Sequence, residues 1–362
     1  MPILMPNSRY RSVGGIVFGG GIALITALTG CATLWDGFGA ANPQSCVVTP
    51  SLCSAEEYCN PATNQCEIAD GGSMPPDSGV DLGELPTKWA LVPSGTTVDL
   101  RGVWGASSSD AWIVGDAGTI LNWNGSTWSS TTSPTAMDLY AIWGTDWKSI
   151  FAVGNQGVIV RYNGSQWKSQ NSPRPVSLRG VWGLNQDEVW AVGLGGWIFK
   201  GGFGNNWSVQ LSPTTEDLHA VWGVSENNLW AVGGSQTVVR NTGSGWYIEG
   251  TGANSTQNGL WGVNKSNIWS AGTLGSVRFW DGSSWKDLAV NSDVTRSVLY
   301  VYGTDASHIW MTGERGLLLF FDGAQWSKLP TGTTSDLNGI VRVGANDLWM
   351  VGSHGTILHQ TL

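Results

Sequence analysis

The sequence predicts an all-β protein, a seven-bladed β-propeller with N/C-terminal strand closure, preceded by a small disulfide-rich module. The main observation is a phrase that recurs seven times between Asp99 and Leu362, at intervals of 39 to 41 residues. Each copy contains four short apolar runs bounded by Gly, Asn, Asp and Ser, which is typical of a four-stranded blade. No sustained helical period is present in this part of the chain.

Each copy has two anchor residues and a closing tryptophan. The first anchors are Trp104, Trp143, Trp182, Trp222, Trp261, Tyr302 and Val341. The second anchors follow eight residues later, at Trp112, Phe151, Trp190, Trp230, Trp269, Trp310 and Trp349. The fourth run closes with a tryptophan in six copies, at Trp128, Trp167, Trp207, Trp246, Trp285 and Trp326. The seventh copy stops before this run, so its fourth strand has to come from elsewhere.

Residues 87–94 are the candidate for the missing strand. Trp89 stands 10 residues before Asp99, just as Trp128 stands 10 residues before Asp138. Pairing this segment with the C-terminal strands closes the ring and removes the exposed edges of an open array.

The links between runs carry turn residues. The second and third runs are joined by Gly-x-x-Gly, as in Gly115–Gly118, where we expect glycine to supply a positive φ. The third and fourth runs are joined by Asn-Gly or Asp-Gly, as in Asn124-Gly125, which is a strong hairpin signature.

Tryptophan is the most informative residue type, because 22 of the 23 lie in the repeat region. A tryptophan can remove roughly 150–250 Å² from water, so the repeated ones are expected to pack between blades. Trp123, Trp147, Trp197 and Trp280 fall outside the pattern and are candidates for exposed aromatic platforms.

Residues 1–30 have the pattern of an export signal. They carry Arg9 and Arg11, no acidic residue, and an apolar stretch from Val13 to Leu28. Leu28-Thr29-Gly30-Cys31 resembles the lipobox of bacterial lipoproteins, which implies that Cys31 is lipid-modified and becomes the mature N-terminus. The alternative is cleavage elsewhere, with Cys31 left as an odd thiol. Ala32 follows the cysteine, and by the same resemblance this favours the outer membrane. A multi-chain lipid anchor holds a soluble domain stably at a membrane.

Residues 31–66 are expected to form the lipid anchor and a small cysteine-rich module. Cys46, Cys53, Cys59 and Cys66 are an even set in an exported segment, which predicts two disulfides in one of three pairings. Zinc is the alternative, but the CxxC pairs typical of structural zinc are absent. The segment 53–66 resembles small modules of bacterial surface lipoproteins. Residues 67–86 are rich in Gly, Pro and acidic residues and are expected to be a flexible acidic linker to the propeller at 87–362.

The charge balance limits the partners. The formal net charge is −9, and without residues 1–30 there are 16 basic and 27 acidic residues. No basic stripe is present, so nucleic acid is not expected as a partner.

The repeat Val-Trp-Gly, Trp-Ala-Val-Gly, Gly-x-Ile and Asp-Gly-x-x-Trp resembles the bacterial neuraminidase-repeat, or Asp-box, propellers. It is especially similar to the photosystem II assembly-factor type. The segments 280–285 and 321–326 come closest to an Asp-box, but both lack one residue between the Asp and the Gly, so only the type of hairpin matches. The group includes sialidases, lectin-like binders and assembly factors, so the resemblance does not decide the function.

The sequence offers little support for catalysis. The resemblance implies that a sialidase would place three arginines on one carboxylate beside a tyrosine nucleophile, and the spacing of the nine arginines in the blades singles out no such triad. No paired-carboxylate motif is recognisable, and no metal-ligand spacing joins the four histidines. We therefore expect no catalytic residue, cofactor or metal.

One position varies inside the otherwise uniform repeat. The residue three before the first anchor is Arg101, Tyr140, Arg179, His219, Asn258, Leu299 or Asn338. It lies near the start of the innermost strand, where a propeller gathers residues from every blade around its central channel, so these residues are candidate ligand-binding residues. The alternative is that they hydrogen-bond to the backbones of neighbouring blades. Arg315 and His354, on the Gly-x-x-Gly links, are expected on the same face.

These observations favour a non-catalytic, monomeric binding or scaffold lipoprotein of the cell envelope, anchored to the outer membrane. The mixture of Arg, Tyr and His suits an anionic or sugar-like group of a glycan, or an acidic loop of an envelope protein. The alternative function is a carbohydrate-active enzyme, a sialidase-like hydrolase or lyase, acting at the cell surface.

Overall fold

The computed structural model describes residues 57–60, 65–68, 89–235, 237–249, 255–290, 294–344 and 347–361. The chain divides into two compact units, Met1–Asp81 and Leu82–Leu362.

In the first unit, β1 (Glu57–Asn60) and β2 (Gln65–Ile68) pair antiparallel, with Cys59 opposite Cys66 in the register. The signal segment 1–30, Cys31, Cys46, Cys53 and the linker from residue 69 onward lie outside the described residues, as do the side chains of Cys59 and Cys66. The lipid anchor and the disulfide-rich module therefore receive no support from the structure and stay predictions.

The second unit contains seven antiparallel sheets of four strands each. The strands of blades one to three are β4 (Leu100–Ser107), β5 (Asp110–Gly115), β6 (Ile120–Trp123), β7 (Trp128–Ser130), β8 (Leu139–Asp146), β9 (Ser149–Gly154), β10 (Ile159–Tyr162), β11 (Trp167–Gln170), β12 (Leu178–Asn185), β13 (Glu188–Gly193), β14 (Ile198–Gly201) and β15 (Ser208–Gln210). Those of blades four and five are β16 (Leu218–Ser225), β17 (Asn228–Gly233), β18 (Val238–Asn241), β19 (Trp246–Ile248), β20 (Gln257–Asn264), β21 (Asn267–Gly272), β22 (Val277–Trp280) and β23 (Trp285–Leu288). Blades six and seven are formed by β24 (Val298–Asp305), β25 (His308–Gly313), β26 (Leu317–Phe321), β27 (Trp326–Lys328), β28 (Leu337–Val343), β29 (Asp347–Gly352), β30 (Ile357–Thr361) and the N-terminal β3 (Ala90–Leu91).

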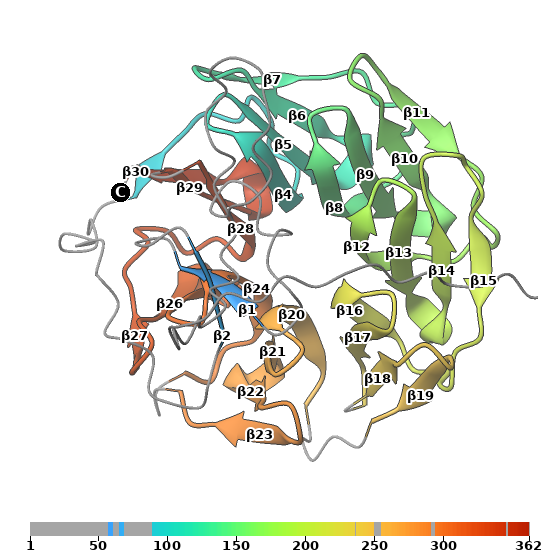
Figure 1. Ribbon diagram of the computed structural model, residues 1–362. Helices are drawn as coiled ribbons and strands as arrows, with labels where there is room; N and C mark the ends of the chain where they lie inside the picture. The colour runs from blue at the N-terminus through green and yellow to red at the C-terminus, as the bar shows by residue number, and fades with distance from the viewer. Residues whose placement is uncertain are drawn as a thin grey trace, which may run out of the picture. The chain divides into compact units, whose positions relative to one another are not determined.

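The seven-bladed ring and its closure are confirmed. Figure 1 shows the sheets around a common centre, with the first strand of each blade innermost. The last sheet has the order β28-β29-β30-β3, and Leu91 of β3 lies opposite Leu358 of β30. The Val92 N–H extends the pairing by donating to the Ile357 carbonyl at 2.9 Å. A strand from the start of the propeller therefore completes the blade made by its end, and no blade lacks its fourth strand.

Each Gly-x-x-Gly link forms a 3-10 turn, and glycine is required at its two ends for different physical reasons. The second glycine has a positive φ, 69° at Gly118, as predicted. The first does not: Gly115 is extended, with φ −163°. A Cβ on it would lie 2.4 Å from the carbonyl oxygen of Asp99, which accepts a hydrogen bond from the Asp116 N–H. The expectation of a positive φ at the first glycine was wrong, because close backbone approach is what requires glycine there.

The same turns join successive blades. The third residue of each link is left-handed, and at four of the seven junctions its N–H donates to an aspartate that begins the next blade. Ala117 donates to the Asp138 Oδ1 at 2.9 Å, and Gly195 donates to the Asp217 Oδ1 at 2.7 Å. In blade seven the His354 N–H donates to the Asp99 Oδ1 of blade one at 2.9 Å. This contact crosses the closure point, so the ring is joined there by the same hydrogen bond as elsewhere.

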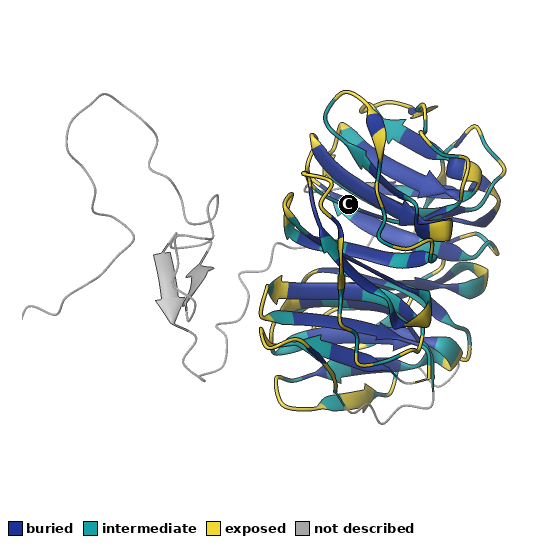
Figure 2. Cartoon of the chain, turned by 90° about the vertical axis from the view of Figure 1, so that its right-hand side faces the viewer, coloured by how far each residue is buried: buried dark blue, intermediate teal, exposed yellow. Residues whose placement is uncertain are grey.

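The first-anchor tryptophans pack between blades, as predicted. A Cβ on Gly144 of blade two would lie 2.9 Å from the Trp104 ring of blade one, and a Cβ on Gly303 of blade six would lie 2.5 Å from the Trp261 ring of blade five. The Trp-Gly dipeptide therefore recurs because each tryptophan occupies space that only a glycine leaves free. Figure 2 shows the result, with buried residues filling the strands and exposed residues at the loops.

The four tryptophans outside the pattern behave differently from one another. Trp147 is 52% exposed, whereas Trp123 and Trp197 are half-buried. Trp280 is 4% exposed, and its indole N–H donates to the Lys265 carbonyl at 3.0 Å. Trp280 is therefore not an exposed platform, because the loop before β21 accepts its polar edge while the ring packs in the core.

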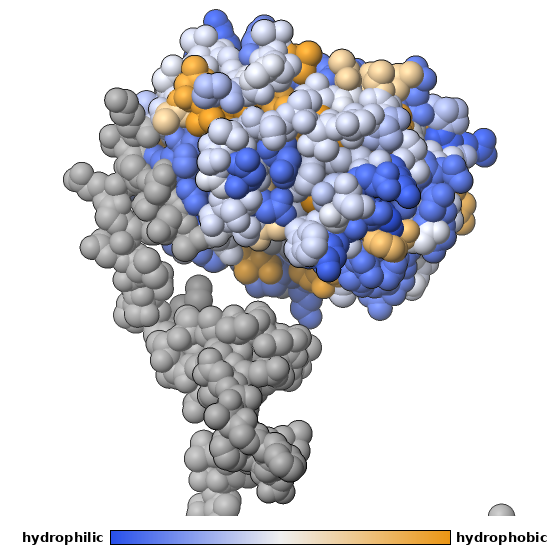
Figure 3. Space-filling model, turned by 90° about the horizontal axis from the view of Figure 1, so that it is seen from above, coloured by the Kyte–Doolittle hydropathy of each residue, from blue (hydrophilic) through white to orange (hydrophobic). Residues whose placement is uncertain are grey.

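The outer surface is mixed. Figure 3 shows one side of the propeller as largely hydrophilic, with separate apolar groups. No helix among the described residues is long and apolar enough to span a membrane.

Substitution Gly233→Ala tests the close approach in the turn of blade four. Its Cβ would lie 1.8 Å from the Asp217 carbonyl oxygen, so we expect the free energy of unfolding to fall by about 3 kcal/mol. Urea denaturation measures this. The control is Gly204→Ala, where the nearest atom is 3.9 Å away. Equal stability of the two variants would contradict the argument.

Candidate functional site

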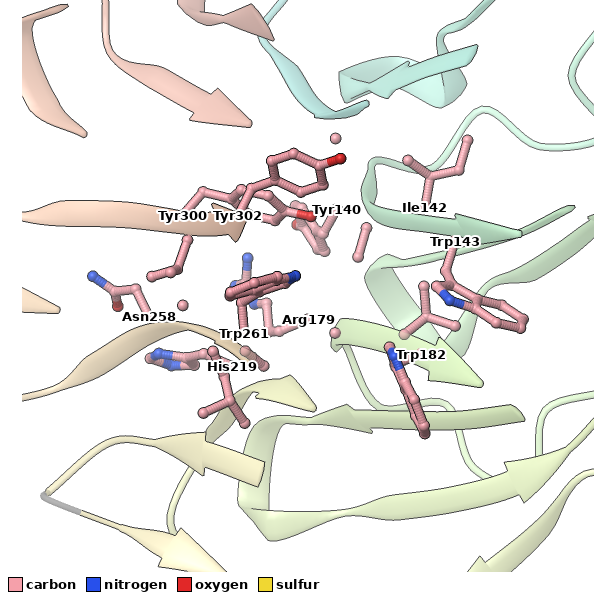
Figure 4. A pocket seen from close by; sticks show the side chains of 18 of the residues that line it. Tyr140, Ile142, Trp143, Arg179, Trp182, His219, Asn258, Trp261, Tyr300 and Tyr302 are labelled. Atoms are coloured by element: carbon pink, nitrogen blue, oxygen red, sulfur yellow. The ribbon is translucent and has the colours of Figure 1, made fainter. Parts of the chain in front are cut away.

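A channel of about 360 Å³ runs along the centre of the propeller and is lined only by residues of the innermost strands. Most inner strands contribute four consecutive residues to the lining. Along the strand these are the variable residue, a Gly or Ala in most blades, an aliphatic residue and the first anchor, as in Arg101, Gly102, Val103 and Trp104. Figure 4 shows these side chains converging from different blades. The polar end is the end at which the inner strands begin.

All seven variable positions line this channel; they are Arg101, Tyr140, Arg179, His219, Asn258, Leu299 and Asn338. A shift of register in each inner strand explains their placement. In β4 it falls between Leu100 and Gly102, so Arg101 has no partner in the ladder with β5, and each of the other six blades repeats the shift. A bulge of this kind re-aims a side chain.

Arg101 is engaged within its own blade. Its Nε and Nη2 donate to the two carboxylate oxygens of Asp116, each at 2.8 Å, and Nη2 lies 3.1 Å from Asp99. The hydrogen bonds to Asp116 raise the pKa of Arg101. The charge of this guanidinium is therefore compensated inside the protein.

Two asparagines in the ring bind the neighbouring blade. The Asn258 side-chain amide donates to the Val298 carbonyl at 2.8 Å, and that of Asn338 donates to the Leu100 carbonyl at 2.8 Å. The sequence analysis offered two roles for the variable positions, ligand binding or hydrogen bonds to a neighbouring blade. At these two positions the structure shows the hydrogen bonds to the neighbouring blade.

Arg179 differs from Arg101. Its guanidinium carbon lies 4.2 Å from the centre of the Tyr140 ring, in a cation–π contact, and the side chain is half-buried. Among the described residues, no carboxylate forms an ion pair with it. Arg179 is thus a cation at the channel mouth that no described carboxylate compensates.

His219 lies in the ring next to Arg179. Desolvation lowers the pKa of His219, a hydrogen bond with Asn258 opposes this, and the positive charge of Arg179 lowers it further. The imidazole is therefore neutral near pH 7.

Tyr300 also lines the channel, and sequence reasoning missed it. The position two before the first anchor is Gly or Ala in the other six blades, so Tyr300 is the one large residue there. Burial raises the pKa of Tyr300 to about 12, so its hydroxyl stays protonated. The departure from the repeat was visible in the sequence and could have identified it.

Arg315 and His354 do not join this ring. Both are exposed and left-handed, with φ 53° and 58°, in the turns η6 (Glu314–Gly316) and η7 (Ser353–Gly355). Neither lines the channel. His354 lies instead beside a separate hollow formed by residues 91–97. The two residues share the end of the propeller where the inner strands begin, but the structure does not bring them to the channel.

The channel carries no recognisable catalytic set. No Asp or Glu is among its described lining residues, whereas glycoside hydrolysis ordinarily uses two carboxylates. Among the described residues, no group of three His, Cys, Asp or Glu side chains could hold a metal ion. The sialidase-like alternative is therefore not favoured by the site.

The architecture is similar to that of several solved structures. YCF48 from Cyanidioschyzon merolae matches with a TM-score of 0.63 and 18% identity, over 76% of this chain and 99% of that one. A structure of YCF48 bound to a D1 peptide matches with a TM-score of 0.63 and 15% identity, over 76% and 95%. Streptogramin B lyase matches with a TM-score of 0.67 and 14% identity, over 75% and 96%. These neighbours are β-propellers and at such identities they show a shared fold. No protein-family model and no curated protein matches the sequence.

The half-buried His219 predicts a pH dependence of stability. Because its pKa is lower in the folded chain, the unfolded chain binds protons more readily, and stability falls as pH drops below the ordinary histidine pKa of 6.5. We expect His219→Asn to reduce the loss of Tm between pH 7.5 and pH 5 by about 2 °C, the shift that roughly 1 kcal/mol produces in a domain of this size.

Calorimetry at a series of pH values measures this difference. The control is His354→Asn, which changes an exposed histidine. The same pH slope in the wild type and in His219→Asn would show that His219 does not contribute.

Proposed function

We propose that this protein is a non-catalytic binding or scaffold lipoprotein of the bacterial cell envelope, and that it receives a protein partner at the polar end of the channel. The observation that carries the proposal is the ring of seven residues of five types (Arg, Tyr, His, Asn and Leu) at one position of a largely uniform repeat. The buried residue directly before this position varies less, because it is Leu in five of the seven blades.

The comparisons support a protein ligand over a reaction. One similar propeller, YCF48, has been determined with a D1 peptide bound. Another is a lyase, so the fold itself does not exclude catalysis. In this chain the absence of acidic residues from the described channel lining favours binding.

The envelope location rests on the N-terminal sequence. Lipid modification of Cys31 would attach the chain to the outer membrane, and residues 67–86 would act as a tether to the propeller. Such an arrangement presents the propeller to other envelope components.

Binding at the channel mouth is tested with the double variant Tyr140→Ala, Leu299→Ala. Both side chains line the mouth, so we expect at least tenfold weaker binding of envelope proteins to the immobilised full chain. The control is Arg315→Ala, His354→Ala, on the same end but outside the channel. Alanine suits these left-handed positions, because Ala117 occupies the equivalent one in blade one.

A glycan array with the same proteins completes this test. Partners retained by the mouth variant and lost by the control would place the binding surface outside the channel. A defined glycan that binds the wild type and not the mouth variant would replace the protein partner with a carbohydrate.

Lipid modification is tested in a bacterial host that carries lipoprotein-processing enzymes. We expect the wild type to incorporate labelled palmitate and to fractionate with the outer membrane, and Cys31→Ser to do neither. Cys46→Ser is the control and should keep the label. Labelling of Cys31→Ser, or none of the wild type, would refute the anchor.

A further inference from the structure

Two arginines occupy equivalent places in the repeat but have different surroundings. Arg101 of blade one is bound by Asp116 and Asp99. Counting from the first anchor, the positions of these two aspartates are taken in blade three by Leu194 and Ser177. Blade three therefore keeps the cation, Arg179, while both of the counter-charges found in blade one are missing.

The contact of Arg179 with Tyr140 leaves its hydrogen-bond donors available. A guanidinium stacked on an aromatic ring uses its flat face, and its N–H donors point outward in the plane. The guanidinium carbon lies 4.2 Å from the Tyr140 ring centre, and among the described residues no acceptor takes a hydrogen bond from Arg179. Paired N–H donors in one plane match the two oxygens of a carboxylate.

The rest of the lining favours an anion of low charge. No Asp or Glu is present among the described lining residues, and the protonated Tyr300 hydroxyl can donate a hydrogen bond, whereas His219 is already hydrogen-bonded to Asn258 and to the Gln257 backbone. Arg101 is already compensated, so the mouth offers one uncompensated guanidinium. The whole chain has a net charge of −9, which repels polyanions at long range. A single carboxylate fits these conditions better than a phosphate dianion or a nucleic acid.

We propose that Arg179 binds one carboxylate of a polypeptide at the mouth of the channel, with Tyr140 holding the guanidinium in place. This inference rests on the proposed function and names the chemistry that the site recognises. The carboxylate can come from an acidic side chain or from a chain end, because both present the same planar pair of oxygens.

Acetate is the simplest probe, and acetamide is its neutral counterpart of the same shape. The side-chain Nε–H resonances of arginine, observed by NMR on the full chain, report binding. The Arg179 resonance is assigned by its loss in Arg179→Gln. We expect acetate to shift it saturably and acetamide to leave it unchanged. Two blocked tripeptides, Gly-Glu-Gly with an amidated end and Gly-Gln-Gly with a free carboxylate, then distinguish the two sources.

The decisive variant leaves Arg179 intact. Leu194→Asp gives blade three the carboxylate that Asp116 supplies in blade one, so we expect the acetate affinity read from the Arg179 resonance to fall at least tenfold. Arg315→Gln is the control, because Arg315 lies outside the channel and Gln156 occupies the equivalent left-handed position in blade two; its acetate affinity should stay within twofold of the wild type. Because Asp116 occupies the same turn position in blade one, the repeat accepts an aspartate there. Melting temperatures verify that each variant is folded.

Three results would overturn the inference. The first is an equal shift of the Arg179 resonance by acetate and acetamide. The second is full carboxylate affinity in a folded Leu194→Asp protein. The third is that no carboxylate binds. If no carboxylate binds while the mouth variant Tyr140→Ala, Leu299→Ala still loses its protein partner, this inference fails and the proposed function stands.

Discussion

The close contact between each Gly-x-x-Gly turn and the first residues of the blades is the constraint on which the rest of the propeller depends. The first glycine lets the turn approach the carbonyl at the start of its own blade, at Asp99 in blade one. The left-handed residue then directs its N–H to the next blade, as Ala117 does to Asp138. One short turn thus sets the spacing within a blade and the junction between blades. Since His354 makes the same contact with Asp99, the ring closes without a special device.

The candidate site follows from this constraint. Each inner strand begins beside a turn, and the shift of register directly after its first residue directs the second residue to the channel. The side chains of the turn then decide which channel residues are available. Asp116 in the turn of blade one compensates Arg101, whereas Leu194 in the turn of blade three cannot compensate Arg179. The chemistry of the channel mouth is therefore set partly by residues that do not line it.

Several features could be read from the repeat because they are local or periodic. The blade count, the closing segment around Trp89 and the ring of variable positions depend only on spacing, and the structure places them as predicted. Contacts between blades were harder to foresee. The sequence predicted Trp280 to be an exposed aromatic platform, but it is buried. It predicted Arg315 to bind a ligand together with the channel residues, but Arg315 lies outside the channel.

The sequence by itself determined the architecture, because a period of about 39 residues with four apolar runs is compatible with few folds. It also determined which position varies at the channel. Only the tertiary structure decided which of those residues are free. Arg101 and Arg179 are the same residue type at the same position of the repeat. In the structure Arg101 lies beside Asp116 and Asp99, whereas Arg179 lies beside the ring of Tyr140. Asp99 and Asp116 lie only 2 and 15 residues from Arg101, but ion pairing depends on side-chain distances of about 3 Å, which spacing along the sequence does not determine.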